Sequence, residues 1–268
     1  MDTFGQQHGQ PHGQKLGQQD GQAHRPRVEP CAKRIRAFLG GRPVLDTVRA
    51  RLVWEHPAFP AYYVPVADVG PGLLTPTGRT SSRPGLGEGR LFTLASGGRT
   101  VKDAAWRYED SPVEELRELV RFSWRALDAW FEEDEEVYTH PRDPYKRIDI
   151  LPSSRQVGIE LDGVVVAESG HPSLLFETGL PVRYYLPRTD VRADLLEPGT
   201  RTTHCPYKGA AEHLSVRVGD ELHQDVAWTY RTPLPESQRI AGLVAFYDER
   251  ADIHVDGVLQ PRPHTPFS

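Results

Sequence analysis

The sequence has few sulfur-containing residues, with two cysteines and one methionine among 268 residues. Cys31 and Cys205 stand far apart in the chain, so a disulfide framework is not expected. Two cysteines also cannot build a zinc site from paired CxxC motifs, and no HxH or HExxH spacing offers a histidine-based site instead. We therefore predict no metal site and no cofactor.

Long apolar runs are absent as well. No stretch approaches the roughly 20 residues that a transmembrane helix needs, and the chain starts with polar residues where a secretory signal needs apolar ones. The formal net charge is -5, so the composition does not indicate a nucleic-acid partner. We expect a cytoplasmic globular protein with neither a nucleic-acid nor a membrane partner; the composition does not indicate an oligomeric state.

Apolar residues are also scarce at the two ends of the chain. Residues 1–30 are rich in Gly, Gln, His and Pro, and such a segment cannot bury enough apolar surface to offset the entropy of ordering. We predict a disordered tail over residues 1–30 and a short C-terminal tail over residues 260–268.

An internal repeat is the strongest signal in the chain. The segment YYVPVADV at residues 62–69 recurs as YYLPRTDV at residues 184–191, and the same shift of 122 residues aligns residues 39–108 with the second half without a gap. Matched aromatic, proline and aspartate positions over that length indicate two tandem copies of one domain. We place the copies at residues 31–140 and 150–259.

The pattern within each copy is typical of short strands. Alternating apolar residues flank tight-turn signals such as Asp162-Gly163, and Gly97-Gly98 forms a turn signal in the first copy. Residues 112–120 predict one short helix in the first copy, the longest in the protein, with Ser111 as its N-cap. Beyond residue 108 we expect a longer insert in the first copy, with residues 130–131 matching residues 246–247.

Four motifs of the second copy suggest a family. The run at residues 188–198, the motif TTHCPYKG at residues 202–209 and the segments 225–230 and 240–247 follow one another in an order that resembles domain of unknown function 427. The resemblance implies a mainly β protein of two antiparallel β-tent domains, a fold also found in methionine sulfoxide reductase B and in the thalidomide-binding domain of cereblon. Those relatives often carry zinc on paired cysteines, whereas this chain implies the fold without zinc. The family is sometimes labelled a nucleotidyltransferase, although the acidic metal-binding pattern of that chemistry is not evident here.

The two copies differ most at the CPYKG motif, residues 205–209. Pro206 and Gly209 align with the same residue types in the first copy. Their neighbours do not, because His204, Cys205, Tyr207 and Lys208 align with Ser82, Arg83, Gly85 and Leu86. The first copy folds without these side chains. The comparison therefore favours a functional role for them and places a ligand site at this turn.

Several roles remain open at the turn. Cys205 is either a nucleophile, activated by His204 and Lys208, or a small packed hydrophobe. Lys208 is either an anion contact, helped by Arg192 and by the close backbone approach that Gly209 permits, or a surface lysine. Tyr207 is a candidate ligand contact.

Three residues outside the motif complete the candidate set. Trp228 is matched by Trp106, which favours a core role, although it could also form a pocket wall. Glu177 and His213 are weaker candidates for an acid or base.

The sequence thus predicts a small-molecule-binding protein whose ligand is anionic and whose pocket lies at the CPYKG turn. Such a protein is an enzyme if Cys205 or His204 supplies covalent or acid-base chemistry. The alternatives are a ligand- or protein-binding module without chemistry and a nucleotidyltransferase.

Overall fold

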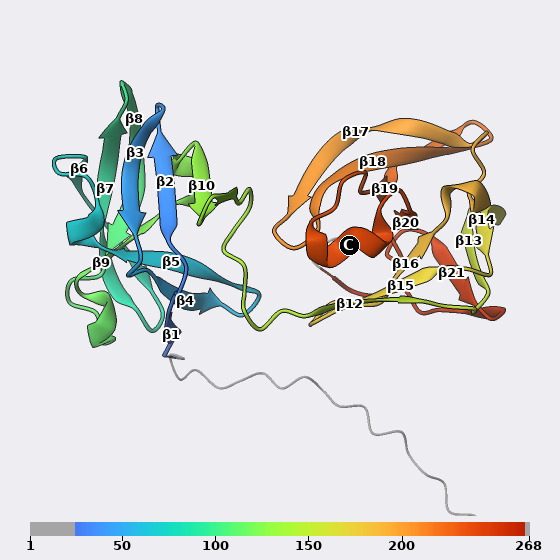
Figure 1. Ribbon diagram of the computed structural model, residues 1–268, viewed down its shortest axis with the longest axis horizontal. Coiled ribbons are helices and arrows are strands. Elements are labelled where there is room, and N and C mark those ends of the chain that lie inside the picture. The colour runs from blue at the N-terminus through green and yellow to red at the C-terminus, as the bar shows by residue number, and fades with distance from the viewer. Residues whose placement is uncertain (1–24, 266–268) are drawn as a thin grey trace, which may run out of the picture.

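The computed structural model describes residues 25–265 of the chain (Figure 1). The predicted disorder of residues 1–24 lies outside the described residues. Residues 27–30, which we also expected in the tail, form a strand that pairs with the first repeat. The first repeat therefore begins earlier than predicted.

The first repeat contains two antiparallel sheets. The larger sheet has the order β1-β4-β5-β9-β8-β7-β6 and the smaller one the order β11-β10-β2-β3. Their strands are β1 (Arg27–Pro30), β2 (Ile35–Leu39), β3 (Arg42–Thr47), β4 (Arg51–His56), β5 (Phe59–Pro65), β6 (Leu74–Arg83), β7 (Gly87–Ser96), β8 (Arg99–Arg107), β9 (Leu119–Phe122), β10 (Ala129–Glu132) and β11 (Glu135–Glu136).

The second repeat has the same topology. Its larger sheet has the order β12-β15-β16-β20-β19-β18-β17 and its smaller sheet the order β14-β13-β21-β22. Their strands are β12 (Ile148–Pro152), β13 (Val157–Leu161), β14 (Val164–Ser169), β15 (Ser173–Glu177), β16 (Arg183–Leu186), β17 (Leu196–Cys205), β18 (Gly209–Val218), β19 (Glu221–Thr229), β20 (Val244–Phe246), β21 (Asp252–Val255) and β22 (Val258–Leu259). The structure confirms a mainly β protein built from two tandem antiparallel domains.

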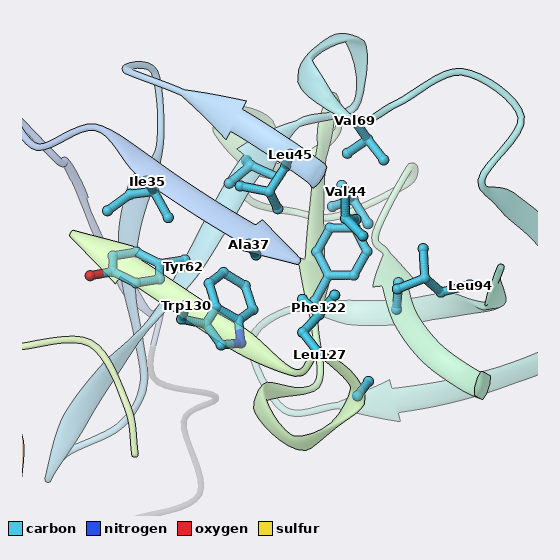
Figure 2. Packing of buried hydrophobic residues seen from close by; sticks show 14 of the residues in the cluster. Ile35, Ala37, Val44, Leu45, Tyr62, Val69, Leu94, Phe122, Leu127 and Trp130 are labelled. Carbon is cyan, nitrogen blue, oxygen red and sulfur yellow. The ribbon is translucent and has the colours of Figure 1, made fainter. Parts of the chain in front are cut away.

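Each large sheet buries residues on both faces. One face packs against the small sheet; in the first repeat Ile35, Tyr62, Phe122 and Trp130 meet there (Figure 2). We call the opposite face the outer face. In the second repeat it carries a separate cluster that includes Tyr185, Trp228 and Tyr230, and strand alternation accounts for the division between the faces. The outer face is where the candidate site residues gather.

The repeats share an unusual backbone position. Asp103 and Asp225 both have a positive φ, 53° and 51°, within β8 and β19. Non-glycine residues rarely adopt this conformation, and aspartate is among those that tolerate it best. The Asp225 carboxylate accepts hydrogen bonds from the backbone N–H and the hydroxyl of Thr200, at 2.8 and 3.0 Å. These bonds fix β17 against β19.

The predicted helix at residues 112–120 was wrong. Only Glu114–Leu116 forms a turn of 3₁₀ helix (η2), because Leu119 already belongs to β9, whose pairing with β5 and β8 overrides local helical propensity. The other 3₁₀ segments are η1 (Val66–Asp68), η3 (Trp124–Ala126), η4 (Arg188–Asp190) and η5 (Pro235–Ile240). Within residues 25–265, η5 is the longest helical segment.

The alignment expected beyond residue 108 was also wrong. Phe122 pairs with Ala105 and Phe246 pairs with Ala227, so Phe122 and Phe246 are equivalent. The shift between repeats rises from 122 to 124 there, which places the longer insert in the second repeat. Trp130 lies instead on β10, which pairs with β2 as β21 pairs with β13.

No helix in the described part of the chain is both long enough and apolar enough to cross a membrane. The cytoplasmic location stays a prediction.

Candidate functional site

The CPYKG turn joins β17 to β18, and Cys205 and Gly209 form the last pair of that ladder. Gly209 has a φ of 93° and its counterpart Gly87 a φ of 88°, a conformation that glycine adopts without a steric penalty. This requirement explains why the glycine is common to both turns. Behind the second turn, the backbone N–H of Leu234 donates to the Lys208 carbonyl at 3.1 Å and the Ser237 hydroxyl to the Tyr207 carbonyl at 3.3 Å.

Lys208 is engaged inside the protein. Its ammonium group lies 2.5 Å from the carboxylate of Glu177, and the two side chains are only 10% and 8% exposed. A buried charge needs such a partner, because removal from water is costly. The structure thus brings together two of the predicted site residues, as an ion pair that satisfies the lysine.

The first repeat builds an equivalent pair from different residues. Glu55, the counterpart of Glu177, accepts a hydrogen bond from the Tyr63 hydroxyl at 2.7 Å and forms ion pairs with Arg83 and Arg121. Arg83 occupies the position of Cys205, so each turn supplies a cation to the same buried glutamate from a different position. The position-by-position comparison of the sequences missed this compensation.

Aromatic side chains lie close to Glu177 of this pair, whose charge acts on the hydroxyls of Tyr185 and Tyr230. The Trp228 indole N–H donates to the Tyr185 hydroxyl at 3.0 Å, and the Trp228 ring lies 4.6 Å from that of Tyr247. Burial raises the pKa of Tyr185 and of Tyr230, so both stay neutral at physiological pH. Trp228 and Tyr230 belong to the buried cluster of the outer face.

Cys205 is a free thiol that is partly buried. Burial is the main cause that raises the pKa of Tyr207 and Tyr230, and the nearby sulfur of Cys205 adds to it. Its neighbour His204 is exposed and packs on Tyr138, with ring centroids 4.9 Å apart. Because successive strand residues point to opposite faces, His204 is not placed to act as a base for Cys205.

Of two other predicted residues, His213 lies beside Trp228 on the neighbouring strand, whereas Arg192 lies apart from this group. His213 is buried, stacks on Tyr247 and shares a 3.0 Å hydrogen bond with the Thr203 hydroxyl; burial lowers its pKa and the charge of Arg201 lowers it further. Arg192 pairs with Asp194 at 2.6 Å. Arg192 precedes β17 and Lys208 follows β17, so a ten-residue strand, about 30 Å long, separates the two cations.

Residues 138–146, which we call the inter-repeat strap, connect the CPYKG turn to the first repeat. On the second-repeat side, Arg142 donates to the Pro206 carbonyl at 2.8 Å, and the backbone N–H of Asp143 donates to the Tyr207 hydroxyl at 2.7 Å. Tyr207 therefore binds the strap, which is the segment that leads into the second repeat.

On the first-repeat side, the strap is bound by side chains of β4, β5 and β10. The Trp54 indole N–H donates to the Asp143 carboxylate at 3.0 Å, and the Glu132 carboxylate accepts from the backbone N–H of Arg142 at 3.2 Å. The His140 ring stacks on that of Phe59, with centroids 4.3 Å apart, and burial lowers the pKa of His140. The strap thus fastens the two repeats together through the CPYKG turn.

A pocket of about 640 Å³ opens beside β17, β18 and β19 of the second repeat. None of residues 205–209 lines it, and of the predicted site residues only His213 does. Leu196 and Leu214, which also pack against the core between the sheets, form part of its wall. We call it the β17–β19 pocket; its lining is Arg188, Leu196, Glu197, Pro198, Gly199, Thr200, Arg201, Thr202, Glu212, His213, Leu214, Thr229, Arg231 and Gly242.

The sequence did not indicate two further features. Arg188 and Arg201 line the β17–β19 pocket but are single arginines among many, and only their position in the fold makes them candidates. Asp162, Glu221 and His223 have side-chain ligand atoms within 4.8 Å of one another, and they form the one such metal-compatible group within residues 25–265. Glu221 and His223 lie two residues apart on β19, whereas Asp162 belongs to the distant turn between β13 and β14, so only the fold brings the three together.

Comparison with known families decides the relationship of the chain. A family model described as a domain of unknown function, DUF427, matches residues 27–133 and again residues 149–257. The chain belongs to the DUF427 family. It carries two tandem DUF427 domains, which correspond to the two repeats of the structure. No curated protein matches the chain.

Proposed function

We propose that this tandem DUF427 protein binds a small anionic molecule in its second repeat, and that the ligand occupies the β17–β19 pocket. The observation that carries the proposal is a pair of arginines, Arg188 and Arg201, that line the pocket and form no ion pair within the described residues. Most of the other arginines there have carboxylate partners. An arginine without one, beside a concave and partly apolar surface, favours an anionic ligand.

A comparison with the first repeat supports the same location. Thr229 and Leu214 line the pocket, and their counterparts in the first repeat are Arg107 and Phe92. The Arg107 guanidinium lies 5.9 Å from the Phe92 ring centroid and also pairs with Glu109 at 3.0 Å. Larger side chains thus occupy this place in the first repeat, and smaller ones leave it open in the second.

This proposal moves the ligand away from the CPYKG turn. Lys208 already pairs with Glu177, and Pro206 and Tyr207 hold the inter-repeat strap. These contacts support a structural role for most of the motif.

A second candidate function is thiol chemistry at Cys205. The free, partly buried thiol next to the buried Lys208–Glu177 pair is the observation that favours it. Cys31 offers an internal control, because it is buried and burial raises the pKa of its thiol. If native protein is not alkylated at Cys205 by iodoacetamide at pH 7, this candidate fails.

Nucleotidyl transfer, the reaction in the family's label, has less support. That chemistry uses divalent metal ions held by carboxylates. The metal-compatible group at Asp162, Glu221 and His223 contributes no residue to the β17–β19 pocket.

The test of the proposed function is an NMR titration of the full chain with benzoate, phosphate and sulfate at pH 7. We expect saturable shifts of backbone amides in β17, β18 and β19. The Arg201→Ala variant should lose them, whereas the matched Arg79→Ala variant of the first repeat should keep them. If no anion produces saturable shifts there, or if both variants behave alike, the proposal is wrong.

A further inference from the structure

The lining of the β17–β19 pocket has an excess of positive charge. Its lining contains two glutamates, and each already has an arginine: Glu197 pairs with Arg217 at 2.6 Å, and Glu212 pairs with Arg231 at 2.8 Å. What remains is two positive charges, those of Arg188 and Arg201. On the basis of the proposed function, the ligand should therefore carry two negative charges.

We infer that the pocket takes a phosphomonoester with a small apolar organic group. A phosphomonoester has a second pKa near 6 and so carries close to two negative charges at pH 7. The planar, forked donors of arginine match phosphate oxygens well. A simple carboxylate would leave one of the two guanidinium groups without a counter-charge.

The wall next to Arg201 is held rigidly, as recognition of a defined group requires. A Cβ atom added at Gly199 would lie 2.4 Å from the Asp225 carboxylate and 2.5 Å from the His213 backbone, so only glycine lets β17 approach so closely. Asp225 also binds the backbone and the hydroxyl of Thr200. Arg201 therefore extends from a fixed piece of backbone.

The first repeat lacks this arrangement. Thr77 stands in the place of Gly199, and Arg79, the counterpart of Arg201, forms an ion pair with Asp103. In the second repeat the counterpart of Asp103 is Asp225, which binds Thr200 instead. Arg201 thus forms no ion pair in the described structure, although Asp225 lies close enough to feel its charge, whereas Arg79 pairs with Asp103.

The remaining lining suits a compact apolar group. Leu196, Pro198 and Leu214 supply apolar surface, and Thr202 adds a hydroxyl. A pocket of about 640 Å³ lies within the range that holds small organic ligands. Phenyl phosphate, which joins a single ring to a phosphate, is therefore a suitable probe.

The experiment compares phenyl phosphate, benzoate and inorganic phosphate by isothermal titration calorimetry on the full chain. We expect phenyl phosphate to bind at least tenfold more tightly than either of the others. Its affinity should rise between pH 5 and pH 7.5 as the second proton leaves, whereas that of benzoate, singly charged throughout, should change little.

Variants of the lining and their matched controls separate the outcomes. Arg201→Ala should weaken phenyl phosphate about tenfold or more, and Thr229→Arg should abolish its binding by filling the pocket as Arg107 does in the first repeat. Arg79→Ala should have no effect.

If benzoate binds as tightly as phenyl phosphate and Arg201→Ala weakens both, the phosphomonoester inference is overturned while the anion pocket stands. If no probe binds, or if binding ignores both Arg201→Ala and Thr229→Arg, the inference and the proposed function fall together.

Discussion

The two repeats satisfy the same buried glutamate in different ways. In the first repeat, Glu55 receives Arg83 from the turn and Arg121 from β9. In the second, Lys208 is the one cation paired with Glu177 among residues 25–265, because Ala245 stands in the place of Arg121 and Cys205 in the place of Arg83. A side chain that looks unique in one copy can therefore perform a task that another position performs in the other copy.

The same comparison gives opposite results at the β17–β19 pocket. There the first repeat fills its space with Arg107 and Phe92, and the second leaves an opening between smaller residues. Even the neighbouring ion pair is reversed, since Arg90–Glu109 in the first repeat becomes Glu212–Arg231 in the second. Where residue differences between the repeats compensate one another, they indicate a structural role. Where they leave an open space and an unbalanced charge, they favour ligand binding.

The largest expected effect comes from breaking the compensated pair. Lys208→Leu puts the residue of the first repeat at this position and leaves Glu177 buried without a cation, which should destabilise the second repeat by about 3–5 kcal/mol. Adding Cys205→Arg should restore much of that loss, because an arginine there reproduces the first repeat. Hydrogen exchange resolved by repeat would measure both changes.

The matched control for this pair is Arg83→Cys in the first repeat. Glu55 keeps Arg121 in that variant, so its destabilisation should be clearly smaller than that of Lys208→Leu. Equal losses in the two repeats, or a double variant no more stable than the single one, would show that the turn does not neutralise the glutamate.

A second difference concerns pH. Asp248, beside Arg183 in the second repeat, stands where the first has Trp124, and burial raises its pKa from 3.8 to about 6. Because the folded state holds this proton more tightly than the unfolded state, the contribution of Asp248 to stability should fall as pH rises from about 4 to about 6 and then level off. The difference amounts to about 3 kcal/mol at most.

Unfolding of the second repeat by urea, measured across this pH range, would test the effect. Asp248→Asn should remove this contribution, so the stability of the variant relative to the wild type should rise between pH 4 and pH 6, whereas Asp194→Asn, at an exposed pair of the same repeat, should show no such rise. A second repeat whose stability rises between pH 4 and pH 6 in the wild type, but not in the Asp248→Asn variant, would contradict the proton assignment.

The smallest expected effect is at the inter-repeat strap. Tyr207→Phe removes the hydroxyl that accepts the Asp143 N–H, which should cost about 1–2 kcal/mol and loosen the attachment between the repeats. Residual dipolar couplings would report the relative orientation of the repeats. Tyr184→Phe removes a hydroxyl of β16, outside the strap, and should leave the couplings unchanged. Identical couplings in wild type and Tyr207→Phe would contradict the role of Tyr207.

The sequence predicted the tandem β architecture well, because the two copies share matching residues at a constant shift of 122 and each copy shows the pattern of short strands. The predicted helix at residues 112–120 was wrong, because Leu119 and Val120 pair with β5 and β8 as part of a strand. Sheet pairing of this kind joins residues far apart in the chain. No local propensity could have signalled it.

The sequence also singled out the CPYKG turn, but the structure gives its side chains structural contacts where a ligand site was expected. Cys205, Tyr207 and Lys208 do distinguish the second repeat, but Lys208 serves Glu177 and Tyr207 serves the strap. The pocket residues Arg188 and Arg201 could not be singled out, because an unpaired arginine is recognised only when all its neighbours in space are known. Whether Cys205 reacts stays a prediction.

The inter-repeat strap also determines where the chain can be divided for separate study. The second family match starts at residue 149, which is a natural place to cut. A fragment that starts there would lose Arg142 and Asp143, so the Pro206 carbonyl and the Tyr207 hydroxyl would lack the donors that they have in the intact chain. Dissection of this protein into single domains should therefore keep residues 138–146 with the second half.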